Sequence, residues 1–135
     1  MDADKYIPQR YPFKMTDRVI DILPGLSADA IKLLNINDWY FDNQSSDPKM
    51  PKPLAIEALA QTGACAILSM NQFAGKNVFF GGIKQATFKD AFRPGDILHL
   101  SVEMQRIIGN FGIGHGVIVR NHKVICTADL IFAVE

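Results

Sequence analysis

The sequence has few cysteines and no excess of charge of either sign. Its two cysteines, Cys65 and Cys126, are too few for a disulfide framework, so we expect reduced and buried thiols. Fourteen lysines and arginines balance fourteen aspartates and glutamates, and the basic residues are scattered along the chain. This balance excludes the strongly basic surfaces that bind nucleic acids or anionic membranes, so neither is expected as a partner.

Long apolar runs and metal-binding motifs are missing as well. The longest mainly apolar segment, residues 54–70, is interrupted by Glu57, Gln61 and Thr62, which argues against a membrane span. The acidic N-terminus leads into no apolar stretch, so we expect no signal peptide and a cytoplasmic protein. The histidines and cysteines show no metal-ligand spacing, and no phosphate-binding or dinucleotide-binding motif is present. We therefore expect no metal and no cofactor.

The first half of the chain contains two predicted strands, a polar loop and one helix. Residues 18–23 and 27–35 are the predicted strands. Residues 37–53 are rich in proline, asparagine, aspartate and serine, which is typical of a loop. Alanine, leucine and isoleucine then occur on every side of a predicted helix over residues 54–70, with Pro53 at the first helical position. We expect this helix to be buried nearly all round.

The second half of the chain alternates between apolar and polar residues, as strands do. Four strands are predicted here, over residues 78–88, 98–105, 111–119 and 123–134. Two strands, one buried helix and four further strands predict a single α+β domain over residues 1–135. An antiparallel sheet of about six strands wrapped around one long central helix is the arrangement called the hot-dog fold.

Glu57 is the only carboxylate in the predicted helix, and two interpretations of it stay open. Burial disfavours the charged form of a carboxylate, which would prepare Glu57 to donate a proton near neutral pH. Alternatively, Glu57 is simply an acidic residue near a helix N-terminus, where the helix dipole stabilises it. The free backbone N–H groups of that N-terminus are a second candidate for chemistry, since such groups can polarise a carbonyl.

Glycines within the predicted strands and the three histidines are weaker signals. Glycine weakens a strand unless something must pass close to the backbone, and either a slender ligand chain or the packed central helix would explain it. Packing is the favoured explanation. The glycines concerned are Gly81, Gly82, Gly112, Gly114 and Gly116. We expect His99 on the polar face of its strand and His122 in a hairpin turn, while His115 lies either in the core or in a pocket.

Three motifs occur in order along the chain. They are Ile7-Pro8-Gln9-Arg10-Tyr11-Pro12-Phe13 with Asp17-Arg18-Val19, then Glu57-Ala58-Leu59-Ala60-Gln61, and then Gly82-Ile83-Lys84-Gln85-Ala86-Thr87-Phe88 with Pro94-Gly95-Asp96. Together they resemble the FabZ-type 3-hydroxyacyl-ACP dehydratases, which read roughly L-P-H-R-Y-P-F, E-A-x-A-Q and G-I-x-x-A-x-F…P-G-D at these places. The resemblance runs from about Ile7 to the end of the chain and implies a hot-dog fold.

The loop ahead of the helix departs from the family pattern. In the family a histidine precedes the helix glutamate by fourteen residues, and the residue at that distance here is Asn43. Pro48 and Pro51 keep their places, so the alignment needs no gap, but Lys52 replaces a glycine. The resemblance makes Glu57 the acid that protonates the departing hydroxyl group and the missing histidine the base. An asparagine amide accepts no proton near pH 7, so ordinary dehydration is expected to be impaired.

The resemblance also implies the rest of the site and the partners. The expected catalytic positions are Glu57 and Asn43, and the expected substrate-binding residues are Lys52, Pro53, Gln61, Gly82 and Phe88. The substrate would be a thioester of acyl carrier protein or coenzyme A, in the biosynthesis of fatty acids or polyketide-type chains. Family dimers take the histidine of each site from one chain and the glutamate from the other. We therefore expect a homodimer or higher homo-oligomer, with a heterodimer with an intact paralogue as a further possibility.

Three functions remain open on the sequence, in descending order of preference. The first is a dehydratase-like enzyme whose site is impaired, or in which Asp42 or Asp47 serves as a replacement base. The second is a hot-dog thioesterase, in which Glu57 activates water or attacks the thioester and Asn43 orients the reactants. The third is a non-catalytic subunit that binds acyl groups or a partner chain.

Overall fold

The computed structural model describes residues 3–10, 13–42 and 44–135. Over these residues the chain forms six strands, one α-helix and two short 3-10 helices. The strands are β1 (Arg18–Leu23), β2 (Ser27–Leu33), β3 (Val78–Phe88), β4 (Ile97–Ile108), β5 (Phe111–Arg120) and β6 (Lys123–Val134). The helices are η1 (Ala3–Lys5), α1 (Lys52–Leu68) and η2 (Asn71–Phe73).

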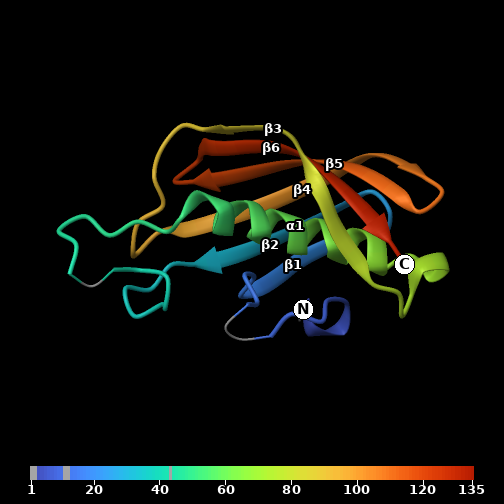
Figure 1. Cartoon of the computed structure of the whole chain (residues 1–135), viewed down its shortest axis with the longest axis horizontal. Helices are drawn as coiled ribbons and strands as arrows, with labels where there is room; N and C mark the ends of the chain where they lie inside the picture. Colours follow the sequence, from blue (N-terminus) through green and yellow to red (C-terminus); the bar gives the residue numbers. More distant parts are fainter. Residues whose placement is uncertain (1–2, 11–12, 43) are drawn as a thin grey trace.

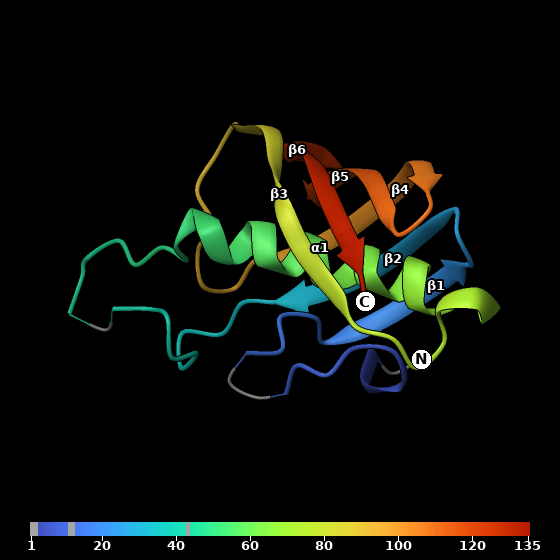
Figure 2. The ribbon, with the colours of Figure 1, turned by 45° about the vertical axis from the view of Figure 1, so that its right-hand side comes forward.

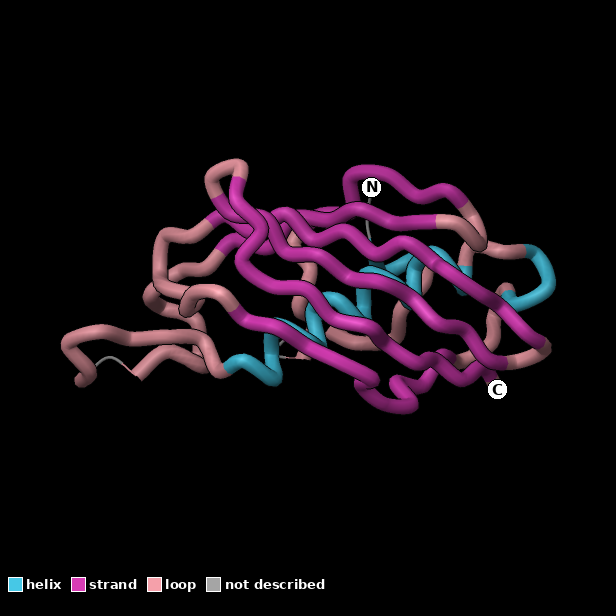
Figure 3. Tube along the Cα trace, turned by 90° about the horizontal axis from the view of Figure 1, so that it is seen from above, coloured by secondary structure: helices cyan, strands magenta, loops and turns pink. Residues whose placement is uncertain are grey.

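The six strands form one antiparallel sheet in the order β1-β2-β4-β5-β6-β3. The sheet curls around α1, with β1 and β2 on one side of the helix and β6 and β3 on the other (Figures 1 and 2). Seen from above, the strands cross over the helix as a single layer (Figure 3). This is the hot-dog fold, so the predicted α+β class is confirmed.

The predicted strands agree closely with the observed ones. The bounds of β1, β3 and β6 match the prediction, whereas β2 ends two residues early at Leu33. Strand β4 continues beyond residue 105 to Ile108, because a bulge between Met104 and Arg106 lets pairing with β5 resume. Alternation of apolar and polar residues thus located the strands of the second half of the chain, but it gave no sign of the bulge.

The helix α1 is buried nearly all round, as predicted. From Ala55 to Leu68 every residue is buried except Glu57, which is half-buried. The prediction for Pro53 was wrong by one position: Pro51 is the N-terminal flanking residue, so Lys52 is first in the helix and Pro53 second. Proline is tolerated there because the first N–H groups of a helix have no partner within the helix.

A line of glycines on β5 lets the sheet approach the helix closely. A Cβ atom on Gly116 would lie 3.0 Å from Leu59 Cδ1 of α1, and one on Gly114 would lie 3.0 Å from Val102 Cγ1. The helix contributes Gly63, where a Cβ atom would lie 2.6 Å from Phe132 Cζ. Close packing therefore explains the β5 glycines, as favoured from the sequence.

Cys65 and Cys126 are both buried and free. Burial raises the pKa of Cys65 to about 12 and that of Cys126 to about 11, so both are protonated, unreactive thiols at neutral pH. None of the helices in the described part of the chain has the length and apolar character needed to cross a membrane.

Candidate functional site

Glu57 lies in the second turn of α1, at the one position of its buried stretch that is not fully covered. Gln61 follows one helical turn later, so both side chains lie on the same face of α1. The Gln61 Nε2 atom donates a hydrogen bond of 3.0 Å to Glu57 Oε1. The helix thus presents a carboxylate whose orientation is fixed by a neighbouring amide.

Gln61 is itself held by the N-terminal segment. Its side chain is buried, with 1% of its surface exposed. The Oε1 atom accepts a hydrogen bond of 2.7 Å from the backbone N–H of Met15, and Nε2 donates one of 2.8 Å to the carbonyl of Phe13. With the bond to Glu57, both amide hydrogens are in use. Gln61 was predicted to bind substrate, and that prediction stays untested; its bonds favour a role in positioning Glu57.

A small cavity of about 30 Å³ opens beside these two residues. Three polar side chains line it, those of Gln9, Glu57 and Gln61. The rest of the wall is apolar and comes from α1, β3 and β6, through Ala60, Ala64, Val78, Phe80 and Phe132. This volume accommodates one water molecule or one hydroxyl group.

Lys52 and Phe88, both predicted to bind substrate, lie together at the N-terminal end of α1. The Lys52 ammonium group lies 5.2 Å from the centre of the Phe88 ring, a cation–π contact. Phe88 in turn packs edge-on against the buried ring of Phe92. Pro53 is exposed beside them, and among the described residues no side chain caps this helix end. Lys52 is exposed at this helix end, and its ammonium group is held over the Phe88 ring.

Gly82, the last of the predicted substrate-binding residues, lies in β3 next to a bulge between Phe80 and Gly82. Its φ of 153° is one that other residues rarely adopt, and a Cβ atom there would meet no atom within 4 Å. The glycine is thus required by the backbone of the bulge.

The second predicted catalytic residue, Asn43, lies outside the described residues. The loop that contains it extends from one end of the domain (Figures 1 and 2). Its two ends are tied to the segment before β4. The Leu34 N–H donates to the Asp96 carbonyl at 3.0 Å, and the Met50 N–H donates to the Phe92 carbonyl at 2.8 Å.

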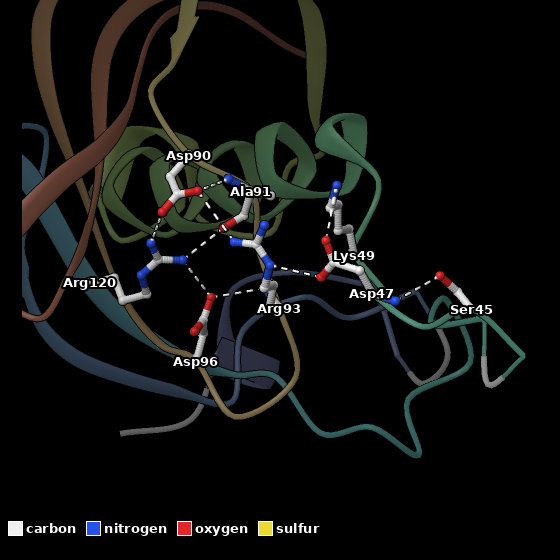
Figure 4. Close-up of polar contacts among 8 residues, drawn as sticks. All are labelled: Ser45, Asp47, Lys49, Asp90, Ala91, Arg93, Asp96 and Arg120. Carbon is white, nitrogen blue, oxygen red and sulfur yellow. Dashed lines mark hydrogen bonds and ion pairs between the residues drawn. The ribbon is translucent and has the colours of Figure 1, made fainter.

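Charged side chains add a second attachment for this loop. Asp47 accepts a hydrogen bond of 3.0 Å from Arg93 Nε, and Arg93 lies 3.4 Å from Asp90 (Figure 4). Arg120 of β5 pairs with both Asp90 and Asp96. We call these residues, Asp47, Asp90, Arg93, Asp96 and Arg120, the ion-pair cluster.

Hydrogen bonds in and beside the ion-pair cluster lower the pKa of two of its carboxyl groups, those of Asp47 and Asp90. The hydrogen bond from Arg93 holds the pKa of Asp47 below its usual value. The backbone N–H of Ala91, followed by Arg120, lowers the pKa of Asp90. Such carboxylates are weaker bases than an ordinary aspartate, which counts against Asp47 as a replacement for the missing histidine.

The histidines lie away from Glu57. His99 lies on the exposed face of β4 and His122 in the β5–β6 turn with a positive φ of 64°, as predicted. His115 lies on the outer face of the sheet, where its Nδ1 atom is 2.8 Å from Asp129 Oδ1. The core interpretation of His115 was therefore wrong, because the alternate residues of β5 are the glycines that face α1. No group of three or more potential ligands is placed to bind a metal ion in the described ranges.

Sequence reasoning missed one residue of this site, Gln9. It lines the cavity beside Glu57, although 48 residues separate the two along the chain. The only signal was the motif Ile7 to Phe13, in which Gln9 stands where the family has histidine.

Comparisons with known proteins were consistent with this geometry. A family model described as a FabA-like domain matches residues 7–129. The 3-hydroxyacyl-[acyl-carrier-protein] dehydratase FabZ of Ligilactobacillus salivarius is 44% identical over 134 residues, covering 98% of this chain and 96% of that protein. The protein of the same name from Clostridium botulinum (strain Loch Maree) is 43% identical, covering 98% and 93%.

Solved structures share the fold at much lower identity. A chain of the dehydratase heterocomplex ApeI:P from Xenorhabdus doucetiae matches with a TM-score of 0.86 and 17% identity, covering 100% of this chain and 91% of that chain. The Escherichia coli PaaI protein from the phenylacetic acid degradation operon matches with a TM-score of 0.68 and 11% identity, covering 86% and 81%. From the family model and the near full-length relatives, we conclude that the chain belongs to the FabA-like family and, within it, to the FabZ-type group that its motifs predicted.

Proposed function

We propose that this protein binds 3-hydroxyacyl thioesters and supplies Glu57 as the acid of a dehydratase site that lacks its usual base. The observation that carries the proposal is the half-buried Glu57 carboxylate, held by Gln61 at the edge of a cavity in an otherwise buried helix. Glu57 would protonate the hydroxyl group that leaves C3 as a proton leaves C2. The names of the relatives support acyl carrier protein as the carrier of the acyl chain.

The missing base determines the expected rate. Asn43 cannot take up the C2 proton, and Asp47 is paired with Arg93, which lowers its pKa. Loss of a general base commonly slows a reaction by roughly 10² to 10⁴. We therefore propose slow dehydration by this chain alone, and a faster reaction where another chain supplies a histidine.

A second chain has a place to bind in this structure. Strand β3 pairs only with β6, so its other edge is open among the described residues. Three large apolar side chains on this strand are exposed, those of Phe79, Phe80 and Ile83. An open edge with apolar side chains favours pairing with another sheet, which supports a homodimer or a heterodimer with an intact paralogue.

The test restores the histidine. The variant Asn43→His should convert 3-hydroxyacyl-ACP to enoyl-ACP at least a hundredfold faster than the wild type, followed by absorbance of the enoyl thioester. Gln44→His is the matched control, because it places a histidine one residue away in the same exposed loop. Asn43→His combined with Glu57→Gln should lose the gain. A wild type that already dehydrates at the full family rate would refute the impaired site.

Thioester hydrolysis is the second candidate, and the cavity beside Glu57 is the observation that favours it. A water molecule there would lie next to a carboxylate able to activate it. Release of free thiol from acyl-CoA, lost in Glu57→Gln, would establish hydrolysis. If neither enoyl product nor thiol forms while acyl thioester still protects the fold against heat, the protein is a binding subunit.

A further inference from the structure

In the cavity beside Glu57, one buried polar atom has no hydrogen-bond partner among the residues that the structure describes. The side-chain oxygen Oε1 of Gln9 is buried and finds no hydrogen-bond partner within the described ranges. Gln9 lines the same cavity as Glu57 and Gln61. Buried polar groups in proteins are nearly always hydrogen-bonded, so an occupant that donates a hydrogen bond is expected here.

The polar neighbours of Gln9 do not supply that donor. Both amide hydrogens of Gln61 are used, one by the carbonyl of Phe13 at 2.8 Å and one by Glu57 Oε1 at 3.0 Å. An ionised Glu57 only accepts hydrogen bonds. The other residues of the wall are apolar. None of the described residues that line the cavity supplies the donor, so we infer that it comes from a molecule that enters the cavity.

The size and the walls of the cavity restrict that molecule. About 30 Å³ accommodates a single hydroxyl group or water molecule. The bond from Gln61 engages Glu57 Oε1, and both Glu57 and Gln9 line the cavity. A hydroxyl group in the cavity can thus donate a hydrogen bond to Gln9 Oε1 while its oxygen lies beside the Glu57 carboxyl group.

We propose that this cavity binds the 3-hydroxyl group of the acyl substrate and that Gln9 accepts the hydrogen bond from it. Gln9 is then a specificity-determining residue that separates 3-hydroxyacyl from saturated acyl chains. The inference rests on the proposed function, because it takes Glu57 as the site of binding. A saturated chain leaves the Gln9 oxygen without its partner, and the hydroxylated chain should bind roughly tenfold more tightly, as expected for one hydrogen bond.

The experiment compares two ligands that the protein cannot readily turn over. They are pantetheine amides of a 3-hydroxyacyl chain and of the saturated chain of equal length, and calorimetry gives the ratio of their dissociation constants. Wild type should prefer the hydroxylated amide by roughly tenfold. Gln9→Met keeps the length of the side chain but removes the oxygen, so the ratio should fall close to one, because the saturated amide no longer leaves a buried oxygen without a partner.

Two further variants make the result specific. Gln9→Asn shortens the side chain by one methylene group, which moves its oxygen out of reach, so this variant should also lose the preference for the hydroxylated amide. Gln105→Met, in an exposed position of β4, should retain it. An unchanged ratio in both Gln9 variants, with the saturated amide still bound, would overturn the role of Gln9 but leave thioester binding standing. Failure of the wild type to bind either amide would overturn both proposals.

Discussion

The two halves of the candidate site are built in different ways. The helix half, Glu57 with Gln61, is fixed by hydrogen bonds to a buried amide and by a helix packed on every side. The loop half is attached through its ends and through the exposed pair Asp47–Arg93. Buried polar contacts are costly to break, whereas exposed ion pairs contribute little. The Glu57 side chain should therefore be rigidly placed, and the loop should respond to its surroundings.

The largest loss of stability is expected from a substitution where α1 packs against the sheet. Leu59→Ala removes a fully buried side chain that lies against Gly116, and we expect a loss of about 3 kcal/mol in the free energy of unfolding. Urea denaturation measures it. Leu26→Ala, where the leucine is 62% exposed, is the control and should change little. Equal losses in the two variants would contradict the packing described here.

The second-largest loss of stability is expected at Gln61, whose amide holds Glu57. Gln61→Met leaves the N–H of Met15 and the carbonyl of Phe13 without their partner, which should cost about 2 kcal/mol of unfolding free energy. The same urea experiment applies, with the exposed Gln72→Met as control. A neutral Gln61→Met would mean that the N-terminal segment is not anchored through this residue.

As the pH falls, residues 44–50 of the loop should open before the helix α1 does. The pKa values of Asp47 and Asp90 are lowered by their hydrogen bonds to Arg93 and to the Ala91 N–H. Groups with a lowered pKa stabilise the folded state above their unfolded pKa, and this contribution is lost as the pH falls below about 4. Hydrogen exchange at decreasing pH should show residues 44–50 opening ahead of α1. Simultaneous opening would contradict the comparison.

The smallest change in stability is expected when the Asp47–Arg93 ion pair is removed at neutral pH. Asp47→Asn removes an exposed carboxylate whose partner, Arg93, is also exposed and keeps Asp90. We expect no measurable change in the urea midpoint, because exposed pairs contribute little. A clear loss of stability would show that the loop is part of the packed domain. Lys49→Met tests the weaker contact of Asp47 in the same way.

The sequence predicted the parts of the molecule that depend on local pattern. Alternating residues located β3 and β6, and the motif Glu57-Ala58-Leu59-Ala60-Gln61 singled out the two helix residues of the site. The contribution of Gln9 was not predictable, because its segment has no periodicity and the cavity that it lines with Glu57 brings together positions 48 residues apart. The ion-pair cluster likewise joins three distant segments. His115 was assigned to two possible places because the sequence does not say which face of β5 the helix covers.

The hydrogen bonds of Leu34 and Met50 bear on how much substitution this loop tolerates. They fasten the two ends of the loop to one short stretch, residues 92–96, so the loop leaves the domain and returns to it at the same place. Substitutions in a surface loop attached in this way need no compensating change in the core. The chemistry of the loop can therefore change without disturbing α1 or the sheet.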